Sequence, residues 1–149
     1  EGQEAAASAA LAPLPAIGGT TVPSGEAEAW TLQSQVSSAT LHADGVVEVR
    51  MADRDARNMF SEAFSSGMRE VFARIADDAR CRVVVLTGYD NYFASGGTPE
   101  TLLSIQQGRE VFTDNTVFAL PLFCPVPVIA AMQGHGIGAG WALGMYADD

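Results

Sequence analysis

Two short apolar runs that each lead directly into a glycine-rich loop constrain the fold of this chain more than any other feature. The first run is Val83-Val84-Val85-Leu86, and the second extends from Pro127 to Met132. A short continuous apolar run predicts a strand that is buried on both faces, as in a parallel sheet. The loops that follow the two runs contain Gly88 to Thr98 and Gln133 to Trp141.

The segments around these runs predict an α/β fold. Residues 35–42 and 46–51 are strand candidates on either side of an Ala-Asp-Gly turn signal at 43–45. Residues 60–76 carry one apolar stripe at helical spacing, and this stripe predicts a helix that packs on the core. The order strand, helix, buried strand predicts a right-handed βαβ unit. Between the two buried strands we expect helices over about 99–107, capped by Thr98, and about 109–120.

The glycine-rich loops predict a binding site, because ligands of open α/β sheets bind at the carboxyl ends of the strands. Unpaired backbone N–H groups at two such ends suit an anion or a developing oxyanion. Gly-x-Gly-x-Gly at 136–140 does not fit the dinucleotide fingerprint, and no Gly-Lys-Ser/Thr of a P-loop occurs. The alternative is that the glycines only permit close packing of helix against strand.

Charge and composition exclude several function classes. The chain has eight Arg, no Lys, eighteen acidic residues and a net charge of −10, which argues against nucleic acids and anionic membranes as partners. Without lysine, the chain offers no Schiff base and no ammonium acid. Cys81 and Cys124 form no metal or redox motif, so we expect no metal site and reduced thiols in the cytoplasm. No apolar run is long enough to span a membrane.

The chain divides into a predicted flexible linker or tail at residues 1–29 and a globular domain at 30–149. The first 29 residues are rich in Ala and Pro and contain no aromatic residue and no Arg. Such a leader suggests a domain of a longer, multidomain protein, and the alternative is a terminus without a function.

Few side chains are candidates for chemistry. His135 lies in the second glycine loop, where a neutral imidazole could serve as acid or base, although a structural hydrogen bond is the alternative. Glu100 and Asp114 lie on the predicted helices after the first loop and could face the site. His42, at a strand end, is expected to be an exposed bystander.

Several of these motifs together resemble the crotonase (enoyl-CoA hydratase/isomerase) family over about residues 32–149. Arg57-Asn58, the helix that follows and Val83 to Gly88 look like the opening of such a domain. Phe93 to Gly97 and Gln133 to Gly140 resemble the two oxyanion loops of the family. The resemblance implies the N-terminal half of a crotonase-like ββα spiral, in a domain truncated on its C-terminal side. It also implies an oxyanion hole from the backbone N–H groups of Ser95 and Ala139, with substrate-binding positions at Ala56, Gly96, Gly97 and Gly138.

Finer details are similar to the decarboxylating crotonase-like enzymes of polyketide β-branching cassettes. These details are Gly97-Thr98 after the first loop, residues 102–106 and 112–114, and Gly134-His135-Gly136. The resemblance implies decarboxylation of a 3-methylglutaconyl group, carried on an acyl carrier protein, to a 3-methylcrotonyl-type thioester. It further implies CoA or phosphopantetheine as part of the substrate and no other cofactor, polyketide synthase modules as partners, and a homotrimer.

Two departures from the family pattern keep alternatives open. Ala142 stands where hydratases have a catalytic glutamate, and the proton-donating Lys and His associated with the decarboxylating enzymes are absent from these 149 residues. The alternatives are an enoyl-thioester hydratase or isomerase that uses Asp114 or Glu100, and a non-catalytic module for carrier binding or oligomerisation.

Overall fold

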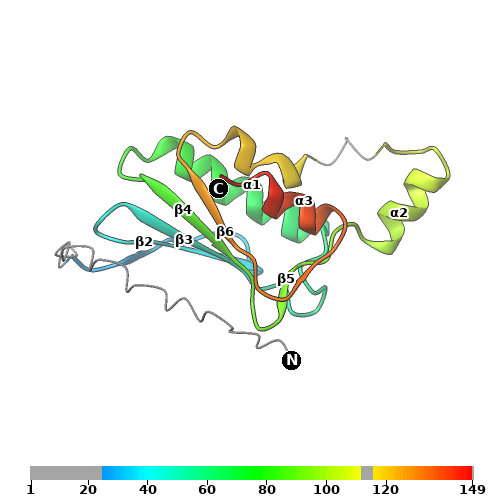
Figure 1. Cartoon of the computed structure of the whole chain (residues 1–149), viewed down its shortest axis with the longest axis horizontal. Coiled ribbons are helices and arrows are strands. Elements are labelled where there is room, and N and C mark those ends of the chain that lie inside the picture. The colour runs from blue at the N-terminus through cyan, green and yellow to red at the C-terminus, as the bar shows by residue number, and fades with distance from the viewer. Residues whose placement is uncertain (1–24, 112–115, 149) are drawn as a thin grey trace, which may run out of the picture.

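A computed structural model describes residues 25–111 and 116–148 and shows one mixed sheet with helices on one side of it (Figure 1). The five strands of this sheet lie in the order β1-β2-β3-β4-β6, and β5 and β7 form a separate pair. The strands are β1 (Glu28–Ala29), β2 (Ser37–Leu41), β3 (Val46–Met51), β4 (Val83–Thr87), β5 (Tyr92–Ala94), β6 (Val128–Ala131) and β7 (His135–Gly136). The helices are α1 (Glu62–Asp77), α2 (Pro99–Gln106) and α3 (Ala139–Met145), with short 3-10 turns η2 (Val117–Ala119) and η3 (Pro121–Phe123).

The predicted hairpin is confirmed. β2 and β3 pair antiparallel, with Leu41 opposite Val47, and Gly45 adopts the positive φ of 88° that the turn requires. β1 extends this sheet, because Glu28 pairs with Leu41 and Ala29 with Thr40. The last two residues of the segment expected to be a linker therefore belong to the sheet, whereas residues 1–24 lie outside the described part of the chain.

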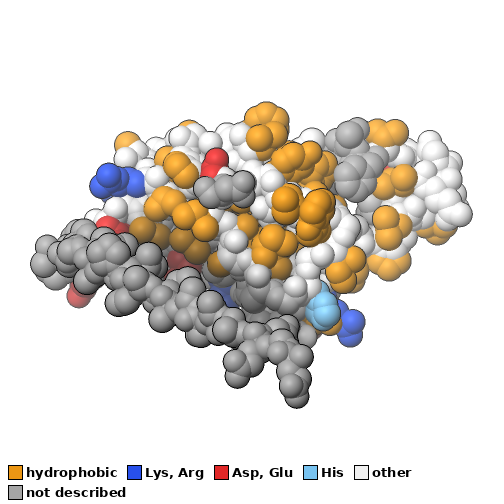
Figure 2. All heavy atoms as spheres, viewed as in Figure 1, with side chains coloured by type: hydrophobic (Ala, Val, Ile, Leu, Met, Phe, Trp, Pro, Cys, Tyr) orange, Lys and Arg blue, Asp and Glu red, His pale blue; other side chains and the backbone are white. Residues whose placement is uncertain are grey.

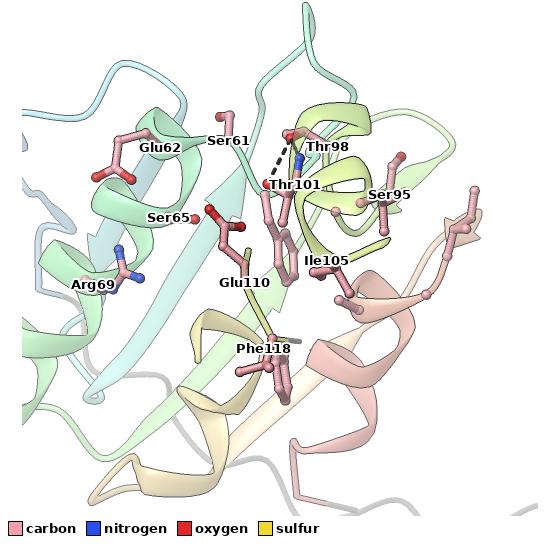
Figure 3. A pocket seen from close by; sticks show the side chains of 17 residues that line it. Ser61, Glu62, Ser65, Arg69, Ser95, Thr98, Thr101, Ile105, Glu110 and Phe118 are labelled. Atoms are coloured by element: carbon pink, nitrogen blue, oxygen red, sulfur yellow. Dashed lines mark hydrogen bonds between the residues drawn. The ribbon is translucent and has the colours of Figure 1, made fainter. Parts of the chain in front are cut away.

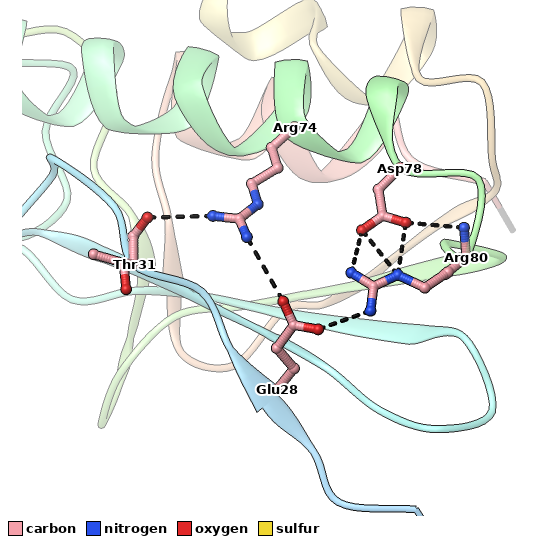
Figure 4. A network of polar contacts seen from close by, with 5 residues as sticks. All are labelled: Glu28, Thr31, Arg74, Asp78 and Arg80. Atoms are coloured by element: carbon pink, nitrogen blue, oxygen red, sulfur yellow. Dashed lines mark hydrogen bonds and ion pairs between the residues drawn. The ribbon is translucent and has the colours of Figure 1, made fainter.

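A polar network fixes β1 to the end of α1 (Figure 4). The Glu28 carboxylate lies 2.8 Å from a guanidinium nitrogen of Arg80 and 3.7 Å from one of Arg74. Arg80 also donates to Asp78, and these hydrogen bonds lower the pKa of the Asp78 carboxyl to about 2. The side chains are partly exposed, so salt screens the network, and its main consequence is to set where β1 begins.

The crossover from β3 through α1 to β4 forms the core. β3 pairs parallel with β4, and β4 pairs parallel with β6, as the apolar runs predicted. α1 begins at Ser61, whose side chain accepts from the Phe64 N–H at 3.1 Å. The apolar stripe of α1 packs on the buried side chains of the strands, which include Val49, Val84 and Leu86.

Burial on both faces, expected of the two parallel strands, is wrong for the described residues. Along β4, Val84 and Leu86 are buried, whereas Val83 and Val85 are only half-buried. On β6, Ile129 is 50% exposed. β6 is the edge strand of the sheet, and the described helices cover only one face.

The connection between β5 and β6 is only partly helical. α2 is confirmed with its Thr98 cap, which accepts from the Thr101 N–H at 3.2 Å. The helix expected over 109–120 is wrong where it can be followed, because residues 117–123 form two 3-10 turns, the second starting at Pro121. A proline lacks the N–H that would continue a helix and restrains the residue before it. Within the described part of the chain, no helix has the length and apolarity needed to cross a bilayer.

Candidate active site

Main-chain pairing brings the two glycine-rich loops together. β5, from the first loop, pairs parallel with β7, from the second, with Tyr92 opposite His135 and Ala94 opposite Gly136. The Ile137 N–H donates to the Ala94 carbonyl oxygen at 3.0 Å, and the His135 N–H donates to that of Asn91 at 2.7 Å. The expectation that both loops meet at the carboxyl ends of their strands is therefore confirmed.

Glycines at the contact allow an approach that other residues would prevent. Gly96 has a φ of 79°, and a Cβ atom there would lie 2.6 Å from the Ile137 carbonyl oxygen and 3.2 Å from the Ala139 nitrogen. A Cβ on Gly140 would overlap the Ala94 carbonyl group. The glycines at 96 and 140 therefore permit the close packing that was the alternative interpretation of these loops.

Buried hydrogen bonds of Asn58 support the first glycine-rich loop. Asn58 is fully buried, its Oδ1 accepts from the Asp53 N–H at 2.8 Å, and its Nδ2 donates to the carbonyl oxygens of Met51 (3.1 Å) and Phe93 (2.8 Å). Its φ of 52° lies in the left-handed region, which Asn tolerates better than most residues. The Asn58 carbonyl oxygen in turn accepts from the Ser95 N–H at 3.2 Å. The sequence named Asn58 only as part of a motif, and this supporting role was missed.

A cavity of about 540 Å³ opens beside the joined loops (Figure 3). Its lining residues lie within 60–69 at the start of α1, within 95–105 on the first loop and α2, and within 137–139 on the second loop, together with Glu110, Val111 and Phe118. The wall is mixed: apolar side chains such as Phe60, Leu102 and Ile105 alternate with hydroxyls and three charged groups. The site can therefore enclose an acyl chain and present polar groups to it.

The predicted oxyanion residues line this cavity, but they differ in what their N–H groups do. Ala139 is the first residue of α3, and its N–H has no acceptor among the described residues. The Ser95 N–H, in contrast, donates to Asn58. Gly97, two residues further on, also lines the cavity, and its N–H has no acceptor in the part of the chain that the structure describes. The geometry therefore favours Gly97 over Ser95 as the first donor, beside Ala139.

A second cavity, of about 460 Å³, lies on the other side of Ser95. It is lined by Asp55, Arg57, Met59, Tyr92, Ser95, His135 and Ile137. The Arg57 guanidinium stands 5.8 Å from the centre of the Tyr92 ring, which lies 5.1 Å from that of His135. Ser95 and Ile137 line both cavities, which are therefore neighbours.

The remaining predicted residues fall at different distances from these cavities. Gly138 lines the larger one, whereas Gly96 stands behind it at the loop contact. Ala56 donates its N–H to the Asp53 carboxylate at 3.0 Å and lines neither cavity. His135 lines only the second cavity.

Among the other chemistry candidates that the structure describes, none lines the larger cavity. Glu100 is exposed and lines neither cavity, and Asp114 lies outside the described residues. His42 lies on the hairpin, 3.7 Å from the Glu48 carboxylate. Among the residues that the structure describes, no cluster of His, Cys, Asp and Glu could hold a metal ion.

Sequence reasoning missed the polar side of α1. Ser61, Ser65 and Arg69 follow one another at intervals of four residues and all line the larger cavity. This spacing places side chains on one face of a helix and was a signal that could have found them.

An ion pair joins the loop after β3 to the loop after β4. The Arg54 guanidinium donates to the Asp90 carboxylate at 2.6 Å and stands 4.7 Å from the centre of the Tyr89 ring. This hydrogen bond holds the pKa of the Asp90 carboxyl below its usual value. Both charged side chains are exposed, so the pair orients the loops and contributes little stability.

The two glycine-rich loops therefore meet at one cavity, and of the two residues that the resemblance implied for an oxyanion hole, Ala139 has an unpaired N–H whereas the N–H of Ser95 is bonded to Asn58. The sequence profile of the enoyl-CoA hydratase/isomerase family matches residues 42–149. The chain belongs to this family. The predicted family and the crotonase-like α/β fold are thereby confirmed.

Comparison with individual proteins shows which members of the family this chain is similar to. The chain is 50% identical over 103 residues to the bacillaene synthase decarboxylase PksI of Bacillus subtilis (strain 168), covering 69% of this chain and 41% of that protein. A solved structure from a dehydratase/decarboxylase enzyme couple of polyketide β-branching matches with a TM-score of 0.78 and 43% identity, over 83% of this chain and 49% of that one. The ECH2 decarboxylase domain of CurF from Lyngbya majuscula matches with a TM-score of 0.69 and 43% identity, over 76% and 46% of the two chains.

More distant members of the family have other activities. The human mitochondrial Δ(3,5)-Δ(2,4)-dienoyl-CoA isomerase is 33% identical over 131 residues, covering 78% of this chain and 39% of that protein. The chain thus spans about two fifths of the length of these two curated relatives, PksI and the human isomerase.

Proposed function

We propose that the protein decarboxylates a 3-methylglutaconyl-type thioester in polyketide β-branching. The observation that carries this proposal is the pair of unpartnered backbone N–H groups, on Gly97 and Ala139, at one acyl-sized cavity. The similarity, at 43–50% identity, to proteins named as decarboxylases and to a structure from a dehydratase/decarboxylase couple supports this reaction over others of the family.

The two N–H groups would act on the thioester carbonyl oxygen. As the bond to the carboxylate carbon breaks, its electron pair moves through the conjugated chain to that oxygen, CO₂ leaves and a dienolate remains. Donors aimed at this oxygen stabilise the charge that develops on it, and loss of one such donor typically slows a reaction about 10²–10³-fold. A proton added to the carbon chain then gives the 3-methylcrotonyl-type product.

Hydration is less well supported, because Ala142 carries no carboxylate at the position where hydratases have their glutamate. Glu100, offered as a substitute, does not line the larger cavity. A purely carrier-binding module is disfavoured by the cavity itself, since binding a carrier protein would not require unpaired N–H groups inside an acyl-sized pocket.

The proposed substrate also suggests a carrier, partner proteins and a location for the protein. The thioester is carried by the phosphopantetheine of an acyl carrier protein or by CoA, with no further cofactor. We propose that the carrier arm occupies the second cavity, which adjoins the larger one and has the Arg57 guanidinium at its wall. We further propose polyketide synthase modules as partners, a homotrimeric assembly and a cytoplasmic location.

A panel of thioesters tests the reaction. The protein is offered 3-methylglutaconyl, crotonyl and 3-enoyl thioesters of pantetheine, and the products are followed by mass. Isomerisation of the 3-enoyl thioester, which leaves the mass unchanged, is followed by chromatographic separation of the isomers. We expect loss of 44 Da from the first thioester and no gain of 18 Da by the second. Hydration of the crotonyl thioester, or turnover of none of the three, would refute the proposal.

A further inference from the structure

Ser65 carries a buried hydroxyl that the fold does not use. It lies on α1, is 2% exposed, and its Oγ has no hydrogen-bond partner among the described residues. A serine inside a helix commonly donates to the carbonyl oxygen four residues earlier. Here the Ser61 carbonyl oxygen accepts only the Ser65 N–H, at 2.9 Å. A buried hydroxyl without a partner costs stability, so its retention calls for a function.

The unpaired hydroxyl lines the larger cavity. Figure 3 shows Ser65 on the α1 side, across the cavity from Ser95 on the first glycine loop. The proposed oxyanion donors belong to the two glycine loops, so a thioester carbonyl held there leaves the far end of its acyl chain near α1.

Arg69 supplies a positive charge at that end of the cavity. Arg69 lies one helical turn beyond Ser65, lines the same cavity and forms no ion pair within the part of the chain that the structure describes. Glu62 and Glu110 also line the cavity and repel an anion. Because of this repulsion, a carboxylate at this wall would need a direct hydrogen bond in addition to the Arg69 charge.

We propose that the Ser65 hydroxyl donates a hydrogen bond to the distal carboxylate of the bound acyl chain, next to the Arg69 guanidinium. The inference rests on the proposed function, because it assigns the carboxylate that is lost as CO₂ to this wall. That carboxylate loses its charge as the bond breaks, so the Ser65 hydrogen bond is stronger in the bound substrate than in the transition state. Its loss should therefore raise KM without lowering kcat, because the bound substrate loses more stabilisation than the transition state does.

Ser65→Ala tests the assignment, with Ser66→Ala as the matched control. Ser66 is the neighbouring serine of the same helix, is exposed and lines neither cavity. For Ser65→Ala we expect KM for the 3-methylglutaconyl thioester to rise about tenfold, as for loss of a hydrogen bond to a charged group, with kcat unchanged or raised. The Tm should stay the same or rise, because the substitution removes an unsatisfied hydroxyl. Ser66→Ala should change none of these values.

Binding of two unreactive thioesters separates this inference from the proposed reaction. Glutaryl-pantetheine carries a distal carboxylate and butyryl-pantetheine does not. Ser65→Ala should weaken the first about tenfold and leave the second unchanged, and Arg69→Gln should do the same. If the wild type decarboxylates but Ser65→Ala binds glutaryl-pantetheine as tightly as the wild type does, the inference is overturned and the proposed function stands. If the wild type is inactive yet this selective loss occurs, the function fails and the carboxylate subsite stands. A fall in Tm with equal weakening of both thioesters shows a structural role and refutes the inference.

Discussion

Replacing Ala139 by proline should remove one of the two proposed oxyanion donors without unfolding the helix that carries it. Ala139 is the first residue of α3, and its N–H has no acceptor among the described residues, so the change deletes no hydrogen bond of the fold. The first position of a helix is also where proline is best tolerated. The preceding Gly138, at φ 55° and ψ −123°, has no Cβ to clash with the proline ring.

The expected loss of activity follows from the proposed role of the Ala139 N–H as an oxyanion donor. A lost oxyanion donor costs about 10²–10³ in kcat, or about 2.7–4 kcal/mol in transition-state stabilisation. Ala139→Pro should therefore reduce turnover of the 3-methylglutaconyl thioester by about that factor while the melting curve followed by circular dichroism changes little.

The same substitution three residues later is the control. The Ala142 N–H donates to the Gly138 carbonyl oxygen at 3.1 Å, inside α3. Ala142→Pro should lower stability by about 3 kcal/mol and lose activity through unfolding. A folded Ala139→Pro variant that keeps full turnover would show that the second donor lies elsewhere and would refute the reasoning.

Three further perturbations test the support of the site. Asn58→Ala removes three buried hydrogen bonds and should lower the free energy of unfolding by about 2–4 kcal/mol in urea titrations; a change below about 1 kcal/mol would contradict its supporting role. Gly140→Ala should force the second loop away from Ala94 and lower both Tm and turnover, and a variant with wild-type Tm would show that the loops are not in close contact. Asp78 has a pKa of about 2 in the folded protein, which is below its pKa in the unfolded chain, so its ionised carboxylate stabilises the fold above the unfolded-state pKa and this stability is lost as the pH falls toward 2. Arg80→Gln removes the hydrogen bonds that lower this pKa and should therefore flatten the pH dependence of stability between about pH 4 and 2, as measured by denaturant midpoints. An unchanged slope would refute the assignment.

The sequence was sufficient to predict those structural elements that a single local pattern determines. The Ala-Asp-Gly turn, the apolar stripe of α1 and the Thr98 cap each specify their structure within a few residues, and all three are confirmed. The position of both glycine loops at one edge was also predictable, because parallel strands align their carboxyl ends.

What sequence reasoning missed depends on contacts between segments far apart in the chain. The Ser95 N–H looked free because nothing near it in sequence accepts it, and its partner Asn58 arrives from the loop after β3. The hydroxyl of Ser65 looked like an ordinary helix residue until the cavity beside it was formed by α2 and the second loop. Burial of β6 was overestimated because an apolar run reports composition and not what covers the strand.

The pairing of β5 with β7 has a consequence for how such a site can change over evolutionary time. The two candidate donors are backbone groups, and the segments that carry them are joined by main-chain hydrogen bonds that most side-chain substitutions leave in place. The cavity wall opposite them is made of side chains from α1 and α2, which a single mutation can alter. New substrates can therefore be explored one wall residue at a time while the proposed activation of the thioester carbonyl is inherited unchanged. Glycines at the contact, such as Gly96 and Gly140, are the exception, and they should be the slowest positions to diverge.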